Sequence, residues 1–177
     1  MSFDDDQLVV PILEQDHIQG LVSASVTLVE YGDYQCLTCG EVHKLIKVIQ
    51  QQVNDLCFVF RHFPQPEIHP CAVRAAEAVE ASATQGRFWQ MHDILFTHQQ
   101  ALGNDYLVEY ANHLGLDIPQ FLQDISKQAH LDRINQDIES GIRSGVTTTP
   151  ALFINGIRYR DRWNIKRLMA AIIPPNN

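Results

Sequence analysis

The sequence has few basic residues, few cysteines and no long apolar run, and each shortage excludes a class of protein. Lysine and arginine number 13 against 21 aspartates and glutamates, a net charge of -8, whereas a nucleic-acid binder usually carries a basic face. No run approaches the roughly 18 apolar residues of a membrane-spanning helix. Four cysteines in 177 residues are too few for a disulfide-scaffolded mini-protein. We therefore expect a protein that uses neither nucleic acid nor a membrane.

The start of the chain lacks the pattern of a secretory leader, which has a positive first segment and then about 7–15 apolar residues. Here the first charged residues are Asp4, Asp5 and Asp6, and the first apolar run, residues 8–13, is broken by Pro11. This pattern predicts a cytoplasmic protein. A periplasmic or other oxidising compartment would require that the N-terminus had been trimmed.

The composition is otherwise that of an ordinary globular protein, with 45% hydrophobic and 19% charged residues. A length of 177 residues fits one domain, or one domain with a large insertion. After an N-terminal arm over residues 1–17, apolar runs at 26–31 and 56–60 predict two buried strands. The apolar stripe between them predicts a helix, so the strands should lie parallel with a right-handed crossover.

A long helical region then interrupts the strand signals, because apolar residues recur at helical spacing across residues 64–145. Strands return at 151–154 and 157–159, joined by Asn155-Gly156, a turn in which both positions accept positive φ. A last helix follows, which Pro174-Pro175 should end. The order βαβ, helical block, ββα predicts an α/β domain, formed by residues 18–63 and 146–177, with an all-helical insertion at 64–145.

Cys36 and Cys39 stand between the first strand and the following helix. We expect both in the first turn of that helix, where unpaired N–H groups and the helix dipole favour a thiolate. Cysteines in such positions have pKa values of roughly 3.5–7.5. Cys36 should be the better solvated nucleophile and Cys39 the buried resolving thiol. Their i, i+3 spacing brings them within disulfide range.

Two other interpretations of this pair stay open. The cysteines could be inert packing residues that share this spacing by chance. A zinc site would need a second matching pair, but Cys57 and Cys71 are single and no histidine pair completes a finger. We therefore predict no metal.

A series of motifs resembles the DsbA-like thiol–disulfide oxidoreductases of the thioredoxin superfamily. They occur in the family's order between about residues 16 and 160, and the resemblance implies a thioredoxin fold with a helical insertion before a cis-proline. The matching segments are Asp16–Gly20, Val26–Gly40 around the cysteines, Arg61–Pro64, His69-Pro70 with Ala75–Ala78, Phe88–Phe96 and Gly145–Gly156.

The resemblance also assigns roles to single residues. Pro150 would be the cis-proline beside the cysteines, and the Thr149 backbone would pair with an extended substrate segment. Glu30 would be a buried acid that relays the proton of Cys39. The plain alternatives are a trans proline that opens a strand and a solvated glutamate at a sheet edge.

The sequence departs from the family pattern between the cysteines. Leu37 stands where many members have proline, and Thr38 stands where strongly oxidising members have histidine. These two residues would face the substrate, and losing the histidine charge should raise the pKa of Cys36 and make the disulfide less oxidising. Cys71 at a helix start is either reactive or packed, and Cys57 should be core. His43, one turn after Cys39, could tune the thiols.

A loop after the hairpin should return to the cysteines, because its second strand runs back toward them. It contains Arg160, Arg162 and Trp163, of which Arg162 and Trp163 are expected on the substrate rim. The basic residues between Arg158 and Arg167 would offer the thiolate or acidic substrates a positive field. The alternative is an ordinary solvated helix start.

Together these features predict a protein thiol–disulfide oxidoreductase that acts through a Cys36–Cys39 disulfide without a metal or organic cofactor. Its partners would be proteins with thiols or disulfides and a redox partner of unknown identity that recycles it. Two other functions stay open, namely a thioredoxin-like binding or chaperone module with a structural cysteine pair, and a glutathione-dependent transferase or isomerase of related fold. The latter needs only one catalytic thiol or hydroxyl, so the presence of Cys39 counts against it.

Overall fold

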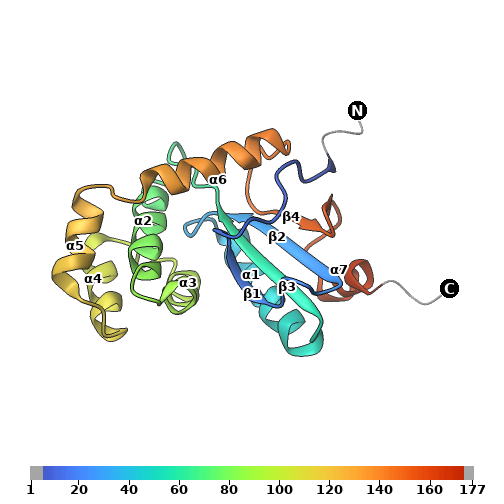
Figure 1. The fold of residues 1–177 in the computed structure, drawn as a ribbon, viewed down its shortest axis with the longest axis horizontal. Helices are drawn as coiled ribbons and strands as arrows, with labels where there is room; N and C mark the ends of the chain where they lie inside the picture. Colours follow the sequence, from blue (N-terminus) through green and yellow to red (C-terminus); the bar gives the residue numbers. More distant parts are fainter. Residues whose placement is uncertain (1–5, 174–177) are drawn as a thin grey trace.

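The computed structural model describes residues 6–173, and within them a five-stranded sheet carries helices on both faces (Figure 1). The strand order is β1-β3-β2-β4-β5. The strands are β1 (His17–Gly20), β2 (Val26–Gly32), β3 (Leu56–His62), β4 (Ala151–Ile154) and β5 (Ile157–Arg158). The helices are α1 (Leu37–Gln52), α2 (Ala72–Ala83), α3 (Phe88–Thr97), α4 (Asn104–His113), α5 (Ile118–Ser126), α6 (Leu131–Arg143) and α7 (Ile165–Ile172).

The centre of the sheet is the βαβ unit that the sequence predicts. β2 and β3 are parallel, with Val26 opposite Leu56 and Gly32 opposite His62. β4 runs antiparallel to β2, so its first residue, Ala151, lies opposite Tyr31 at the end where β2 leads into α1. This register brings the start of β4 to the cysteine end of the sheet.

Successive side chains along each strand point to opposite faces of the sheet, and each face has its own hydrophobic core. Leu28, Phe58 and Leu152 face one side, where they pack with α1, α7 and the helical block. Val29, Val59 and Phe153 face the other side, where partly buried residues of α6 and the N-terminal segment cover them. Figure 1 shows α6 reaching from the helical block along the sheet. The two cores fix the register, because a slip by one residue would move each set of side chains into the core that is packed for the other set.

The N-terminal segment is held by a buried arginine. Arg61 in β3 donates hydrogen bonds to the carbonyl groups of Val10 and Pro11, and it forms an ion pair with Asp16 at 2.8 Å. Its guanidinium also donates to the Tyr31 hydroxyl at 2.9 Å. The segment therefore packs against the sheet before the chain enters β1.

Several elements match the sequence predictions and others were missed. The Asn155-Gly156 turn has the predicted positive φ values, +48° and +80°, and the helices of residues 64–145 are present. β1 was not predicted, because a four-residue segment with one apolar side chain is too short to give a strand pattern, and it forms by pairing with β3. Asp4, Asp5 and Pro174-Pro175 lie outside the described residues. Within residues 6–173, the helices are too short or too polar to cross a membrane.

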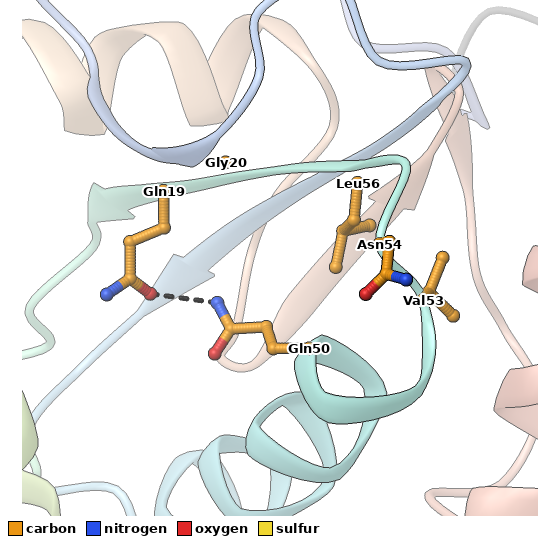
Figure 2. Close-up of a pocket in the computed structure, with 6 residues that line it drawn as sticks. All are labelled: Gln19, Gly20, Gln50, Val53, Asn54 and Leu56. Carbon is orange, nitrogen blue, oxygen red and sulfur yellow. Dashed lines mark hydrogen bonds between the residues drawn. The ribbon is translucent and has the colours of Figure 1, made fainter.

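A pocket of about 410 Å³ lies where β1 and the start of β3 meet the end of α1, away from the cysteines. Gln19 and Gln50 line this pocket, and Gln50 Nε2 donates a hydrogen bond to Gln19 Oε1 at 2.8 Å (Figure 2). Gly20 belongs to its lining and has a φ of +90°. A Cβ at this position would overlap the Leu56 carbonyl oxygen.

Gly20→Ala is therefore expected to destabilise the protein more than Gly86→Ala. Gly86 also has positive φ, +74°, but a Cβ there would meet no atom within 4 Å. The left-handed conformation alone costs about 1–2 kcal/mol, and the overlap should bring Gly20→Ala to about 3 kcal/mol or more. Urea unfolding of both variants measures the difference, and equal losses would contradict the expected clash.

Candidate active site

Cys36 is the N-cap residue of α1, where β2 turns into the helix. Its sulfur accepts a hydrogen bond from the Cys39 backbone N–H at 3.4 Å, which satisfies one of the free amides at the helix start. The turn before it is closed by a hydrogen bond from Cys36 N to the Asp33 carbonyl at 3.1 Å. The sequence prediction of a cysteine pair in the first turn agrees with this geometry.

The two thiols differ in burial and in acidity. Cys36 is 8% exposed and Cys39 is fully buried, and both are free thiols. The pKa of Cys36 is lowered from 9.0 to about 6. A hydrogen bond from the Cys39 side chain is the largest cause; burial opposes it, and bonds from the Cys39 amide and the Thr149 side chain add to it. Burial raises the pKa of Cys39 well above its usual value.

The Thr149–Pro150 peptide bond is cis, as predicted. Its carbonyl side faces the cysteines, since the Cys36 thiol donates to the Thr149 carbonyl at a sulfur–oxygen distance of 3.7 Å. The Thr149 N–H donates to the Gln65 side-chain oxygen at 3.3 Å. Cys36 and Thr149, which are 113 positions apart in the sequence, are thus in contact through the Cys36 sulfur.

Glu30 lies on the α1 side of β2 and is 1% exposed. Burial and, to a lesser extent, the negative charge of Cys36 together raise the pKa of its carboxyl from 4.5 to about 8. Among residues 6–173 its Oε1 has no hydrogen-bond partner. The charge of Glu30 also raises the pKa of Cys39, so the two groups interact. A buried carboxyl without a partner is costly and therefore points to a role beyond packing.

Asp33 joins the cysteine turn to the loop after β3, and sequence reasoning missed it. Its side chain is fully buried and accepts hydrogen bonds from Gln35 N at 2.8 Å, Gln65 N at 2.9 Å and His69 Nδ1 at 2.8 Å. The available signal was an aspartate directly after a buried strand, a position that requires partners. Its negative charge raises the pKa of Cys36, against the hydrogen bonds that lower it.

Gln99, in the loop after α3, is a second residue that the sequence did not single out. Its side-chain amide donates to the carbonyls of Cys36 at 2.7 Å and Tyr34 at 3.0 Å. It also lines a groove of about 430 Å³ beside α1. Leu37, which is 63% exposed, borders this groove, whereas Thr38 is half-buried.

The loop after β5 runs toward the cysteine end of the sheet, since Tyr159 N bonds the Leu152 carbonyl at 2.8 Å. Arg160 pairs with Asp6, and Arg167 pairs with Asp161 at 2.8 Å, so nearby carboxylates offset part of the positive charge. Trp163 packs on Tyr159 with ring centroids 5.5 Å apart. A substrate-rim role for Arg162 and Trp163 stays a prediction.

The remaining cysteines and His43 have distinct surroundings. Cys57 is fully buried in β3, whereas Cys71 is half-buried at the N-cap of α2. Cys71 N donates to the Gln35 side chain at 2.7 Å, which places it beside the cysteine turn. Burial lowers the pKa of His43 to about 4, with Asp93 acting in the opposite direction.

Within residues 6–173, two clusters combine residue types that ligate metal ions, although the sequence spacing gave no sign of them. One contains His43, His92 and Asp93. In the other, the Nε2 atoms of His17 and His62 both lie 2.7 Å from Glu80 Oε1. Burial opposes ionisation of Glu80, but these two hydrogen bonds outweigh it and hold its pKa well below the usual range.

Comparison with known proteins shows which family shares this arrangement. A family model described as thioredoxin matches residues 13–173. Among curated proteins, the chain is 39% identical over 167 residues to the Na+/H+ antiporter NhaA 3 of Salinispora tropica, and 42% identical over 162 residues to NhaA 1 of Mycolicibacterium gilvum. These alignments cover 94% and 90% of this chain but 26% of each relative. The chain therefore spans about a quarter of the length of these relatives.

Solved structures share the fold at lower identity. Oxidised BdbD from Bacillus subtilis superposes with a TM-score of 0.84 at 20% identity, covering 95% of this chain and 96% of the other. The α-DsbA1 protein of Wolbachia pipientis gives 0.80 at 21% identity, covering 93% and 92%. The helical insertion within the sheet fold is thus common to this chain and these structures.

The raised pKa of Glu30 should make stability depend on pH. Between pH 4.5 and about 8 the carboxyl stays protonated in the fold but ionises in the unfolded chain, so stability present below pH 4.5 is lost as the pH rises through this window. Glu30→Gln removes that loss, because the amide does not ionise. As the pH approaches 8, the free energy of unfolding of this variant should therefore exceed that of wild type by roughly 2–5 kcal/mol.

Urea unfolding across this pH window, with Cys36 and Cys39 held as a disulfide so that neither thiol titrates, measures the part of this gain that comes from the burial of Glu30, the larger cause of its raised pKa. Glu67→Gln, at an exposed position of the loop before α2, is the matched control. A stability difference between Glu30→Gln and wild type that is constant with pH would contradict the titration of Glu30.

Proposed function

The chain belongs to the thioredoxin family, in its DsbA-like group of thiol–disulfide oxidoreductases, and from this premise we propose that Cys36 and Cys39 exchange disulfides with protein substrates. The observation that carries the proposal is the Cys36 sulfur, held at the start of α1 with a pKa of about 6. At neutral pH most of this thiol is a thiolate, which is the form that attacks a disulfide.

In the first step the Cys36 thiolate attacks one sulfur of a substrate disulfide. The substrate S–S bond breaks, a Cys36–substrate mixed disulfide forms, and the other substrate sulfur leaves as a thiolate that takes a proton from water. In the second step the Cys39 thiolate attacks Cys36 Sγ and releases the second substrate thiolate. Two electrons have then passed to the substrate, and Cys36 and Cys39 form a disulfide. The same steps run in reverse when substrate thiols are oxidised.

Glu30 is proposed to lose its own proton to water once the mixed disulfide has formed, and its carboxylate then takes the proton from Cys39 before the second step. While Cys36 is a thiolate, its negative charge raises the pKa values of both Glu30 and Cys39. Formation of the mixed disulfide removes that charge, so both groups ionise more readily at the moment when Cys39 must attack. The resolving thiol is therefore activated only after a substrate has been captured.

The substrate backbone is proposed to pair with Thr149 as an added strand beside Pro150, while Leu37 and Thr38 contact its side chains. The exposed leucine and the groove beside it support an extended, partly apolar segment. Sulfur atoms carry both electrons, so the mechanism requires neither a metal nor an organic cofactor. A second protein with a thiol or disulfide returns Cys36 and Cys39 to their starting oxidation state. The reduction potential of that protein decides whether substrates are reduced or oxidised.

Cys36→Ser is expected to abolish reduction of a disulfide-bonded protein such as insulin, because the attacking sulfur is lost. Cys39→Ser should instead accumulate mixed disulfides, which non-reducing electrophoresis detects. Cys57→Ser, in the buried core of β3, is the control for the loss of a thiol as such. Full activity of both active-site variants would refute the mechanism and favour a binding module.

Glu30→Gln should slow the second step without slowing the first. The amide cannot accept the Cys39 proton, so the mixed disulfide should persist roughly 100-fold longer, at the lower end of positioned acid–base catalysis. Rapid quenching at neutral pH separates formation of the mixed disulfide from its resolution. If the mixed disulfide has the same lifetime in wild type and in the variant, Glu30 does not accept the proton of Cys39.

A further proposal concerns the substrate and follows from the curated relatives, which are Na+/H+ antiporters matched over 90% or more of this chain. We propose that cysteine-bearing segments of membrane transporters are among the substrates. Cys39→Ser provides the test, because it retains partners covalently. Mass spectrometry of partners trapped in a membrane fraction should identify transporter peptides, whereas recovery of non-membrane proteins alone would argue against this substrate class.

A further inference from the structure

The side chain of Gln65 lies against the cis-proline segment. Its Oε1 accepts hydrogen bonds from Thr149 N at 3.3 Å and Thr149 Oγ1 at 3.2 Å, and its Nε2 donates to the Thr147 carbonyl at 3.3 Å. The Gln65 backbone is fixed separately, because its N–H donates to the buried Asp33 carboxylate at 2.9 Å. The side chain therefore bridges the loop after β3 and the segment that precedes β4.

These contacts reproduce those of a peptide strand. A carboxamide carries one carbonyl acceptor and N–H donors, as a backbone peptide unit does, and Gln65 uses both kinds of group on Thr147 and Thr149. The Thr149 carbonyl, on its other side, accepts from the Cys36 thiol. The Thr149 N–H, which a substrate strand would use, thus has a partner within the chain, and the Thr149 carbonyl has one only while Cys36 is protonated.

We propose that Gln65 is an internal substitute for the substrate backbone, which an extended peptide must displace before it pairs with Thr149. This inference rests on the proposed function and adds a selection step to the same site. A peptide that offers a continuous backbone replaces the lost hydrogen bonds, whereas a small disulfide reaches Cys36 without displacing Gln65. The side chain thereby slows the reaction with extended substrates and leaves small disulfides unaffected.

The test compares two substrates in wild type and Gln65→Leu, a variant of similar size that lacks the amide. The reduced protein reacts with an unstructured cysteine peptide in disulfide form and with hydroxyethyl disulfide, which has no peptide backbone. The ratio of the two rates cancels any change in the thiolate population, which matters because Thr149 bonds both Gln65 and Cys36. Gln65→Leu should raise this ratio roughly three- to tenfold, the value of one or two exchanged hydrogen bonds.

The matched control is Gln50→Leu, which removes a half-buried, hydrogen-bonded amide at the far end of α1 (Figure 2). Its rate ratio should equal that of wild type. An unchanged or lower ratio in Gln65→Leu would overturn the inference, and a lower ratio would make Gln65 a contact that helps to bind the peptide. A wild-type protein that reacts with neither disulfide would instead overturn the proposed function, and with it this inference.

Hydrogen exchange gives a readout that does not depend on turnover. The Thr149 amide should exchange severalfold faster in Gln65→Leu than in wild type, because its acceptor has been removed. Equal protection of this amide in both proteins would show that Gln65 does not occupy the pairing position.

Discussion

The hydrogen bonds that the start of α1 offers to the Cys36 sulfur are the interaction on which the site depends. The largest contribution comes from the Cys39 thiol, and the Cys39 N–H adds to it because the first amides of a helix have no partner within it. The parallel pairing of β2 and β3 fixes the position of that helix start, and the β2–β4 pairing brings Thr149 to the same sulfur. The fold therefore serves to bring two distant segments to one stabilised thiolate.

The surrounding charges make this stabilisation conditional on the state of the sulfur. Asp33 and Glu30 are both buried acids close to the cysteines, and each disfavours a further negative charge. The hydrogen bonds outweigh this repulsion at Cys36 but not at Cys39, where burial dominates. One thiol is thus ionised at neutral pH while its neighbour stays protonated, and neutralising the first lowers the barrier to ionising the second.

Local signals predicted much of the fold and the centre of the site. Apolar periodicity marks β2, α1 and β3, the Asn155-Gly156 turn marks the hairpin, and the strand-to-helix position of Cys36 predicts its low pKa. The supporting residues could not be found this way, because their roles depend on partners remote in sequence. Gln65 meets Thr149 across 84 positions and Gln99 meets Cys36 across 63. A glutamine in a loop is polar and belongs to no periodic pattern, so the sequence gives no sign that it makes such a contact.

The most direct measurement is the rate at which iodoacetamide alkylates Cys36 as a function of pH, with mass spectrometry to identify the modified residue. The rate should follow a single titration with a midpoint near 6, and Cys39 should stay unmodified in the folded protein. A midpoint near the ordinary value of 9.0, or equal labelling of both cysteines, would contradict the assignment of a helix-stabilised nucleophile and a buried resolving thiol.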